Sequence, residues 1–176
     1  RNVKQISAGG MTSCAVTVHG DVFCWGDNTS GQAGQLNTSE EQNSKIKIPL
    51  QIEIPKKIDS VTVGDIHTCA LSVVKTVYCW GNNSTNNYQV GIVSLDPVFP
   101  IPTRVPNLIN VKEVSAGGIH TCAITKEGEI LCWGNNFQGQ LGNGIFSKSS
   151  LRPTKVTLIK LNDRKNSLFY LSCHYY

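Results

Sequence analysis

Six of the seven cysteines fall into three pairs, and the two members of each pair stand ten positions apart. Thiols at such a spacing can form a disulfide bond, ligate a metal ion or pack as small buried hydrophobic groups. The residues between them alternate in polarity around a turn, as in CAITKEGEILC, which is typical of a β-hairpin. The pairs are Cys14 with Cys24, Cys69 with Cys79, and Cys122 with Cys132.

A disulfide bond suits directly opposed positions of such a hairpin. Their Cα atoms lie roughly 4.5 to 5.5 Å apart, inside the range of roughly 4.4 to 6.8 Å that a disulfide accepts. Because cysteine fills both opposed positions in all three units, we favour three disulfides within hairpins. The alternative, in which the cysteines are buried hydrophobic groups that recur with the repeat, stays open.

Histidine precedes two of the cysteines by two residues, which places two soft donors on one face of a strand. These histidines are His67 and His120, and the first unit carries Thr12 at the matching position. A structural zinc site needs four ligands in short paired spacings, so the pattern gives a metal site little support. We expect neither a metal ion nor another cofactor.

Residues with the spacing of a catalytic site are not found in the sequence. The glycine-rich stretches match neither a phosphate-binding loop nor a dinucleotide fingerprint, and there is no Gly-x-Ser-x-Gly. No pair of carboxylates recurs between units. We therefore expect a binding protein with no catalytic residues, rather than an enzyme.

The hairpins belong to a longer unit that recurs along the chain. Matching segments begin at Ile6, Val61 and Val114, and each is followed by a Gln-containing glycine turn, a polar linker and a proline. Taking Pro49, Pro102 and Pro153 as the start of each new unit divides one partial domain, 1–176, into four. The repeats are 1–48, 49–101 and 102–152, with an incomplete fourth over 153–176 that contains Cys173.

The recurring motifs Ala-Gly-Gly-x-His-Thr-Cys-Ala, Cys-Trp-Gly-x-Asn and Gly-Gln-Leu-Gly closely resemble the regulator-of-chromosome-condensation repeat family over about the first 156 residues. The resemblance implies an all-β protein, a seven-bladed β-propeller with four-stranded antiparallel blades around a channel. This chain would supply about three blades plus the start of a fourth. A ring cannot close with so few, so we expect the remaining blades to come from a longer chain or an assembly.

One tryptophan occupies the same position in each unit, at Trp25, Trp80 and Trp133. Each follows a cysteine on its strand and so points to the opposite face, where we expect it to fill the space between blades. A ligand-binding platform is the alternative. The resemblance gives His67 and His120 a structural role within the blades.

The second unit departs from the other two at its hairpin tip. It carries Lys75 where the others have the turn glycines Gly20 and Gly128. Glycine reaches positive φ without steric cost, whereas lysine does not. The sequence therefore predicts a different hairpin tip in the second unit.

Disulfide bonds would place folding in an oxidising compartment, so we favour an extracellular or lumenal location, with an intracellular one as the alternative. Asn28, Asn37 and Asn83 begin Asn-x-Ser/Thr triplets and are candidate glycosylation sites. Asparagine also tolerates positive φ, so these residues could instead serve the turns. Cysteine-paired repeats of this type resemble those of secreted bacterial proteins and plant crinkly-type receptor ectodomains.

The 16 basic and 12 acidic residues give a formal charge of +4 that is not clustered. A nucleic-acid-binding surface is normally more basic, and no apolar run is long enough to span a membrane, so neither partner is expected. We expect a protein-interaction scaffold that binds through variable segments 36–47, 84–100 and 145–151. The resemblance implies guanine-nucleotide exchange on a small GTPase as one alternative, and a secreted enzyme inhibitor is another.

Overall fold

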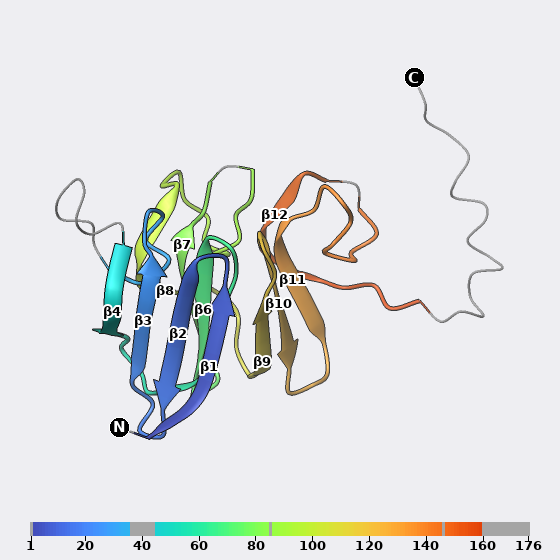
Figure 1. Cartoon of the computed structure of the whole chain (residues 1–176). Helices are drawn as coiled ribbons and strands as arrows, with labels where there is room; N and C mark the ends of the chain where they lie inside the picture. Colours follow the sequence, from blue (N-terminus) through green and yellow to red (C-terminus); the bar gives the residue numbers. More distant parts are fainter. Residues whose placement is uncertain (1, 36–44, 85, 146, 160–176) are drawn as a thin grey trace, which may run out of the picture.

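A computed structural model describes residues 2–35, 45–84, 86–145 and 147–159, which form three four-stranded antiparallel sheets (Figure 1). These ranges contain strands and turns, and no helix long and apolar enough to cross a membrane. The strands are β1 (Val3–Gly9), β2 (Thr12–Thr17), β3 (Val22–Asp27), β4 (Lys45–Ile52), β5 (Ile58–Val63), β6 (His67–Ser72), β7 (Val77–Asn82), β8 (Val98–Arg104), β9 (Val111–Ala116), β10 (His120–Thr125), β11 (Ile130–Asn135) and β12 (Ser149–Lys155).

Each sheet is one blade whose strands pair in chain order, β1 to β4, β5 to β8 and β9 to β12. The first strands of successive blades lie next to each other, since β1 contacts β5 and β5 contacts β9. The expected all-β architecture of four-stranded antiparallel blades is confirmed. Most of the predicted fourth repeat, with Cys173, lies outside the described residues.

The blades are offset from the sequence repeats. Pro49, Pro102 and Pro153, the first residues of the repeats defined from the sequence, lie inside the outermost strands β4, β8 and β12. Each proline falls in an irregularity of the ladder, where three residues stand opposite the tryptophan of the neighbouring strand. Proline is tolerated at a bulge on an edge strand because no ladder hydrogen bond is lost there. A repeat has no intrinsic starting point, so the two divisions describe one period in different frames.

The hydrophobic core lies between blades rather than within them. One cluster joins Cys14, Cys24 and Val16 of the first blade to Ala70 and Trp80 of the second. The other cluster repeats this arrangement one blade further, with Cys69 and Cys79 packed towards Trp133. Each blade therefore has two sides, here named the cysteine face and the tryptophan face after these residues. The cysteine face of one blade packs against the tryptophan face of the next.

The prediction that the second hairpin tip differs is wrong. Lys75 adopts φ 64°, close to the 79° and 82° of Gly20 and Gly128, and its backbone N–H makes the matching turn hydrogen bond to Ser72 O at 2.9 Å. Its Nζ lies 2.7 Å from Asp59 Oδ2, and this hydrogen bond is the main cause of the lowered pKa of Asp59. The side chain therefore gains an ion pair in a conformation that its backbone disfavours.

The energetic cost of that conformation can be measured at Gly128, where no atom lies within 4 Å of an added Cβ. Left-handed φ costs an L-residue about 1–2 kcal/mol, so Gly128→Ala is expected to lower the free energy of unfolding by about 1 kcal/mol in urea titrations. Gly128→Asn is the matched control, because asparagine tolerates this φ. An equal loss in both variants would contradict the backbone explanation.

Candidate functional site

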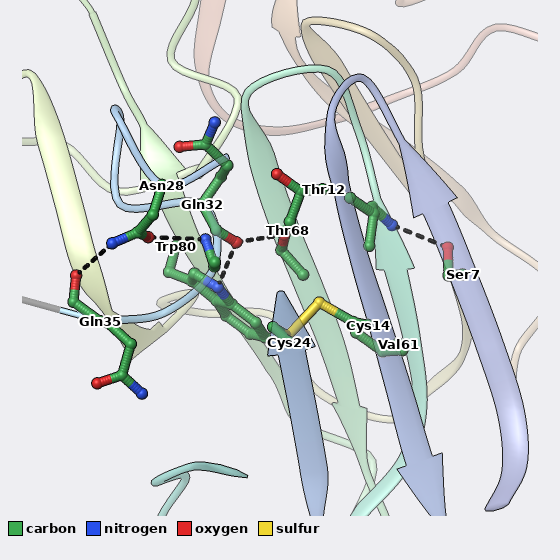
Figure 2. The surroundings of a disulfide bond; sticks show 12 residues. Ser7, Thr12, Cys14, Cys24, Asn28, Gln32, Gln35, Val61, Thr68 and Trp80 are labelled. Atoms are coloured by element: carbon green, nitrogen blue, oxygen red, sulfur yellow. Dashed lines mark hydrogen bonds between the residues drawn. A yellow bond between two sulfur atoms is a disulfide. The ribbon is translucent and has the colours of Figure 1, made fainter. Parts of the chain in front are cut away.

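The structure joins the three cysteine pairs by disulfide bonds across the central hairpin of each blade. In each pair the Cα atoms lie 4.1 Å apart in directly opposed positions. Figure 2 shows the bond between Cys14 and Cys24, both fully buried. The outlying pair differs, since Cys132 is 3% exposed and Cys122 is only partly buried. The third bond lies on a cysteine face against which no described blade packs.

A turn held by side-chain hydrogen bonds follows β3, and we name it the Asn–Gln turn. The amide of Asn28 accepts a hydrogen bond from Ala33 N at 3.0 Å and donates one to Gln35 O at 3.1 Å. Gln32 Nε2 donates to the carboxylate of Asp27 at 2.7 Å. Matching bonds recur after β7 and β11, where the residues are Asn83 with Gln89 and Asn136 with Gln140. There the glutamine donates to an asparagine amide oxygen, of Asn82 and Asn135 respectively, instead of a carboxylate.

These bonds exclude Asn28 and Asn83 as glycosylation sites in the folded chain. Both side chains are buried, at 0% and 1% exposure, and the nitrogen that would carry a glycan donates to a backbone carbonyl. Both asparagines do serve the turns, but through side-chain hydrogen bonds, since neither has positive φ. The third candidate, Asn37, lies outside the described residues.

The Asn–Gln turn also connects each blade to the next through a backbone carbonyl. Gln32 O accepts hydrogen bonds from Trp80 Nε1 at 2.9 Å and Thr68 Oγ1 at 2.8 Å, both on the following blade (Figure 2). At the next interface Gln89 O accepts from Trp133 Nε1 at 2.9 Å and Thr121 Oγ1 at 2.8 Å. We name this arrangement the carbonyl latch. It was not anticipated from the sequence.

The tryptophans lie where the sequence placed them relative to the cysteines. Trp80 and Trp133 are fully buried between blades, which leaves no ring surface for a ligand platform. Trp25 is only partly buried, because the tryptophan face of the first blade has no described blade against it.

His67 is buried at the interface between the second and third blades, with Nε2 2.8 Å from Thr121 Oγ1. Because the Gln89 carbonyl can only accept, the Thr121 hydroxyl donates to it and accepts from the Nε2–H group of His67. Burial, with a smaller contribution from nearby His120, lowers the pKa of His67 to about 3. His120 is partly buried, and burial lowers its pKa also.

Neither histidine is arranged to hold a metal ion together with its cysteine. Cys69 and Cys122 are bonded to other cysteines, so they present no thiolate, and His67 is hydrogen-bonded to Thr121. Across the described ranges, no three His, Cys, Asp or Glu side chains gather into a group that could hold a metal.

Strands β3, β7 and β11 all end at one end of the blades, which we name the loop end (Figure 1); the variable segments 84–100 and 145–151 follow two of these strands in the chain. The described parts expose apolar side chains, with Leu95 93%, Val93 49% and Ile145 60% exposed. The opposite end carries the tight hairpin tips that contain Gly20, Lys75 and Gly128.

Two sequence profiles of the Regulator of chromosome condensation (RCC1) repeat match this chain. One matches 3–32, 58–89 and 111–140, and the other matches 19–71, 76–124 and 127–168. The chain belongs to the RCC1 repeat family. The first profile covers the opening strands and the Asn–Gln turn of each blade, whereas the second spans consecutive blades. The two RCC1 profiles thus begin their repeats at different points of the same period, just as the blades and the sequence repeats begin at different points.

Similar proteins extend well beyond this chain. The human protein named Regulator of chromosome condensation is 32% identical over 141 residues, which cover 80% of this chain and 33% of that protein. Human Probable E3 ubiquitin-protein ligase HERC6 is 31% identical over 80% of this chain and 14% of its own length. Yeast RCC1 (Prp20), solved bound to Kap60, superposes with a TM-score of 0.81 at 26% identity, covering 93% of this chain and 38% of Prp20. This chain thus spans about a third of the human RCC1 protein.

The buried histidine makes stability depend on pH. His67 has an ordinary pKa near 6.5 when unfolded and about 3 when folded, so the unfolded chain binds the extra proton as the pH falls between these values. Stability is therefore complete above pH about 6.5 and falls by up to about 1.4 kcal/mol per pH unit below it. Urea titrations at pH 7, 6 and 5 should show a shallower slope in His67→Gln. An unchanged slope would contradict this assignment.

The three disulfides are expected to differ in their resistance to reduction. Cys122 is partly exposed, whereas the sulfurs of the first two pairs lie in the cores between blades. Limited treatment with a phosphine reductant, alkylation and peptide mapping should label Cys122 and Cys132 first, with labelling of the other pairs at least several-fold slower. Simultaneous labelling of all six cysteines would show instead that reduction requires global unfolding.

Proposed function

We propose that this chain is a non-enzymatic protein-interaction module, in which latched blades hold the loop end against a protein partner. The observation that carries the proposal is the contrast between its two kinds of turn. The Asn–Gln turns repeat the same internal hydrogen bonds in all three blades. The segments beyond them differ between blades and expose apolar side chains, as Leu95 does at 93%. Variable loops on a rigid scaffold are where binding residues concentrate.

Solved relatives support this class of function. Prp20p of Saccharomyces cerevisiae is described with its binding properties to Gsp1p and histones, at 25% identity and a TM-score of 0.81 over 93% of this chain and 40% of Prp20p. Those partners belong to a longer protein. Gsp1p and histones can serve as test partners in binding assays with this chain.

The proposal is tested by binding assays with nucleotide-free Gsp1p, histones and a panel of secreted hydrolases. Leu95→Asp is expected to weaken binding of the responding partner at least tenfold, as loss of a buried apolar contact does. Val74→Asp is the matched control, because Val74 is 57% exposed at the hairpin end. If a partner binds the Leu95→Asp variant normally but no longer binds the Val74→Asp variant, its binding site lies at the hairpin end, which would contradict the proposal.

Guanine-nucleotide exchange is the second candidate, favoured by 32% identity to the human Regulator of chromosome condensation. It requires the chain to accelerate release of a fluorescent GDP analogue from a small GTPase such as Gsp1p. If the chain binds the GTPase without accelerating GDP release, the interaction-module proposal stands and nucleotide exchange by this chain alone is excluded.

An extracellular or lumenal location is part of the proposal, because disulfide bonds form and persist in oxidising compartments. Alkylation of protein taken directly from its native source tests it. Six protected cysteines support the location, whereas reactivity of all of them without reductant would favour a reducing compartment.

A further inference from the structure

Two short connectors cross the described interfaces at the hairpin end, which is the end that carries the hairpin tips. They are 53–57 and 106–110, and each leads from the outermost strand of one blade towards the inner strand of the next. The backbone N–H that follows each connector donates to the hairpin tip of the preceding blade, from Ile58 to Gly20 O at 3.0 Å and from Val111 to Lys75 O at 3.2 Å. Since length and anchor agree, the two connectors can be compared residue by residue.

The second connector fills its interface with a leucine. Leu108, its third residue, is 1% exposed and belongs to the core between the second and third blades. Asn107 and Asn110 on either side adopt φ 57° and 55°, a left-handed conformation that asparagine tolerates better than most residues. A branched aliphatic side chain therefore completes the apolar contact between these two blades.

The first connector has proline at the matching position. Pro55 is exposed, its ring fixes φ near −65°, and no residue of this connector has positive φ. Ile54 packs against the core between the first and second blades but is only partly buried. The residue that corresponds to Leu108 thus leaves its interface unfilled.

A cavity of about 630 Å³ opens beside Pro55, and we name it the connector pocket. Its floor is formed by Val22, Ile52 and Ile58, which all belong to the core between the first and second blades. One wall is Ile101 on β8 of the second blade, which is 50% exposed. The pocket therefore continues an interface between two described blades, and every residue around it lies between positions 20 and 102.

The rim of the connector pocket is charged. Asp21 and Lys57 form an ion pair with 2.7 Å between Oδ1 and Nζ, and the exposed residues Glu53 and Lys56 also line the pocket. A peptide main chain carries both donors and acceptors, so charges of both signs at the rim are complementary to it. An apolar floor below such a rim is suited to one apolar side chain that enters from the main chain.

We propose that the connector pocket binds a segment of a partner protein through one leucine or similarly branched side chain. That side chain takes the place in the first interface that Leu108 takes in the second, and the main chain of the segment lies along the charged rim. The site is at the hairpin end, so it is a second contact, separate from the one proposed for the loop end and independent of it.

A synthetic peptide with the sequence of residues 104–111, RVPNLINV, is the probe, because it presents Leu108 within its own connector. Its ends are acetylated and amidated. Added to the 176-residue chain with labelled isoleucine methyl groups, it is expected to shift the signals of Ile54 and Ile101 until they saturate. A peptide with Leu108→Ala should bind about tenfold more weakly or worse, because most of the buried aliphatic surface is lost.

Variants of the chain test whether the peptide occupies this pocket. Ile101→Asp places a charge on the wall and is expected to abolish peptide binding. Ile109→Asp is the matched control, because Ile109 is 59% exposed on the second connector and does not line the pocket. An exchange variant gives the first connector the sequence of the second, so that a leucine of the chain fills the pocket, and it should also lose binding. Its changes are Glu53→Pro, Ile54→Asn, Pro55→Leu, Lys56→Ile and Lys57→Asn.

Leu95→Asp should leave the affinity for the peptide unchanged, which distinguishes failure of this site from failure at the loop end. Absence of methyl shifts at millimolar peptide overturns the proposal, as does equal affinity for the alanine peptide or normal binding to Ile101→Asp. Isoamyl alcohol is the last comparison. If it binds as tightly as the peptide, the main chain contributes nothing and the pocket is a site for small apolar molecules, which also overturns the proposal.

Discussion

The hydrogen bond from a buried indole to a glutamine carbonyl of the preceding blade is the interaction on which the rest of the structure depends. Burial of about 200 Å² of tryptophan surface stabilises by about 5 kcal/mol as an upper estimate, whereas an unpaired buried N–H costs about 1–3 kcal/mol. Burial alone therefore favours placing Trp80 between blades. The hydrogen bond decides how the ring lies, and because its acceptor belongs to another blade, it also fixes the spacing of the two blades.

The carbonyl can act as a fixed acceptor only if the turn that carries it is rigid. Asn28 and Gln32 supply that rigidity by pairing backbone and side-chain groups that would otherwise be buried without partners. Once the turn is closed, residues further along the loop have no role in joining the blades. They are free to differ in length and to expose side chains such as Leu95, so interaction surface and scaffold are separated within a few residues of one another.

The sequence was informative where side-chain type and period carry the structure. Recurrence of Cys-Trp-Gly predicted the blades, the opposed cysteines and the faces to which Cys69 and Trp80 point. It did not reveal the latch, because the acceptor at Gln32 is a backbone carbonyl, which every residue has. The rule that positive φ requires glycine failed at Lys75, where the compensating ion pair comes from Asp59, 16 positions away in the chain. The tolerance of asparagine for positive φ suggested that Asn28 serves its turn through its backbone conformation. Its φ is not positive, and it stabilises the turn through the hydrogen bonds of its side-chain amide.

Disulfides and latches stabilise different levels of this architecture. Each disulfide closes a loop of about ten residues within one hairpin, worth about 2–3 kcal/mol in the chain-entropy model, and it crosses no boundary between blades. The latches cross every described boundary and lie inside no blade. Stability in such repeats is approximately a sum of unit and neighbour terms. Reduction would weaken the units directly and would also disturb the packing between blades, since the sulfurs of the first two disulfides lie in the shared cores, but it would break none of the latch hydrogen bonds. The relative placement of the loops depends on the neighbour contacts. Redox conditions therefore affect the stability of each blade, whereas the latches determine how the blades are arranged and which surface they present together.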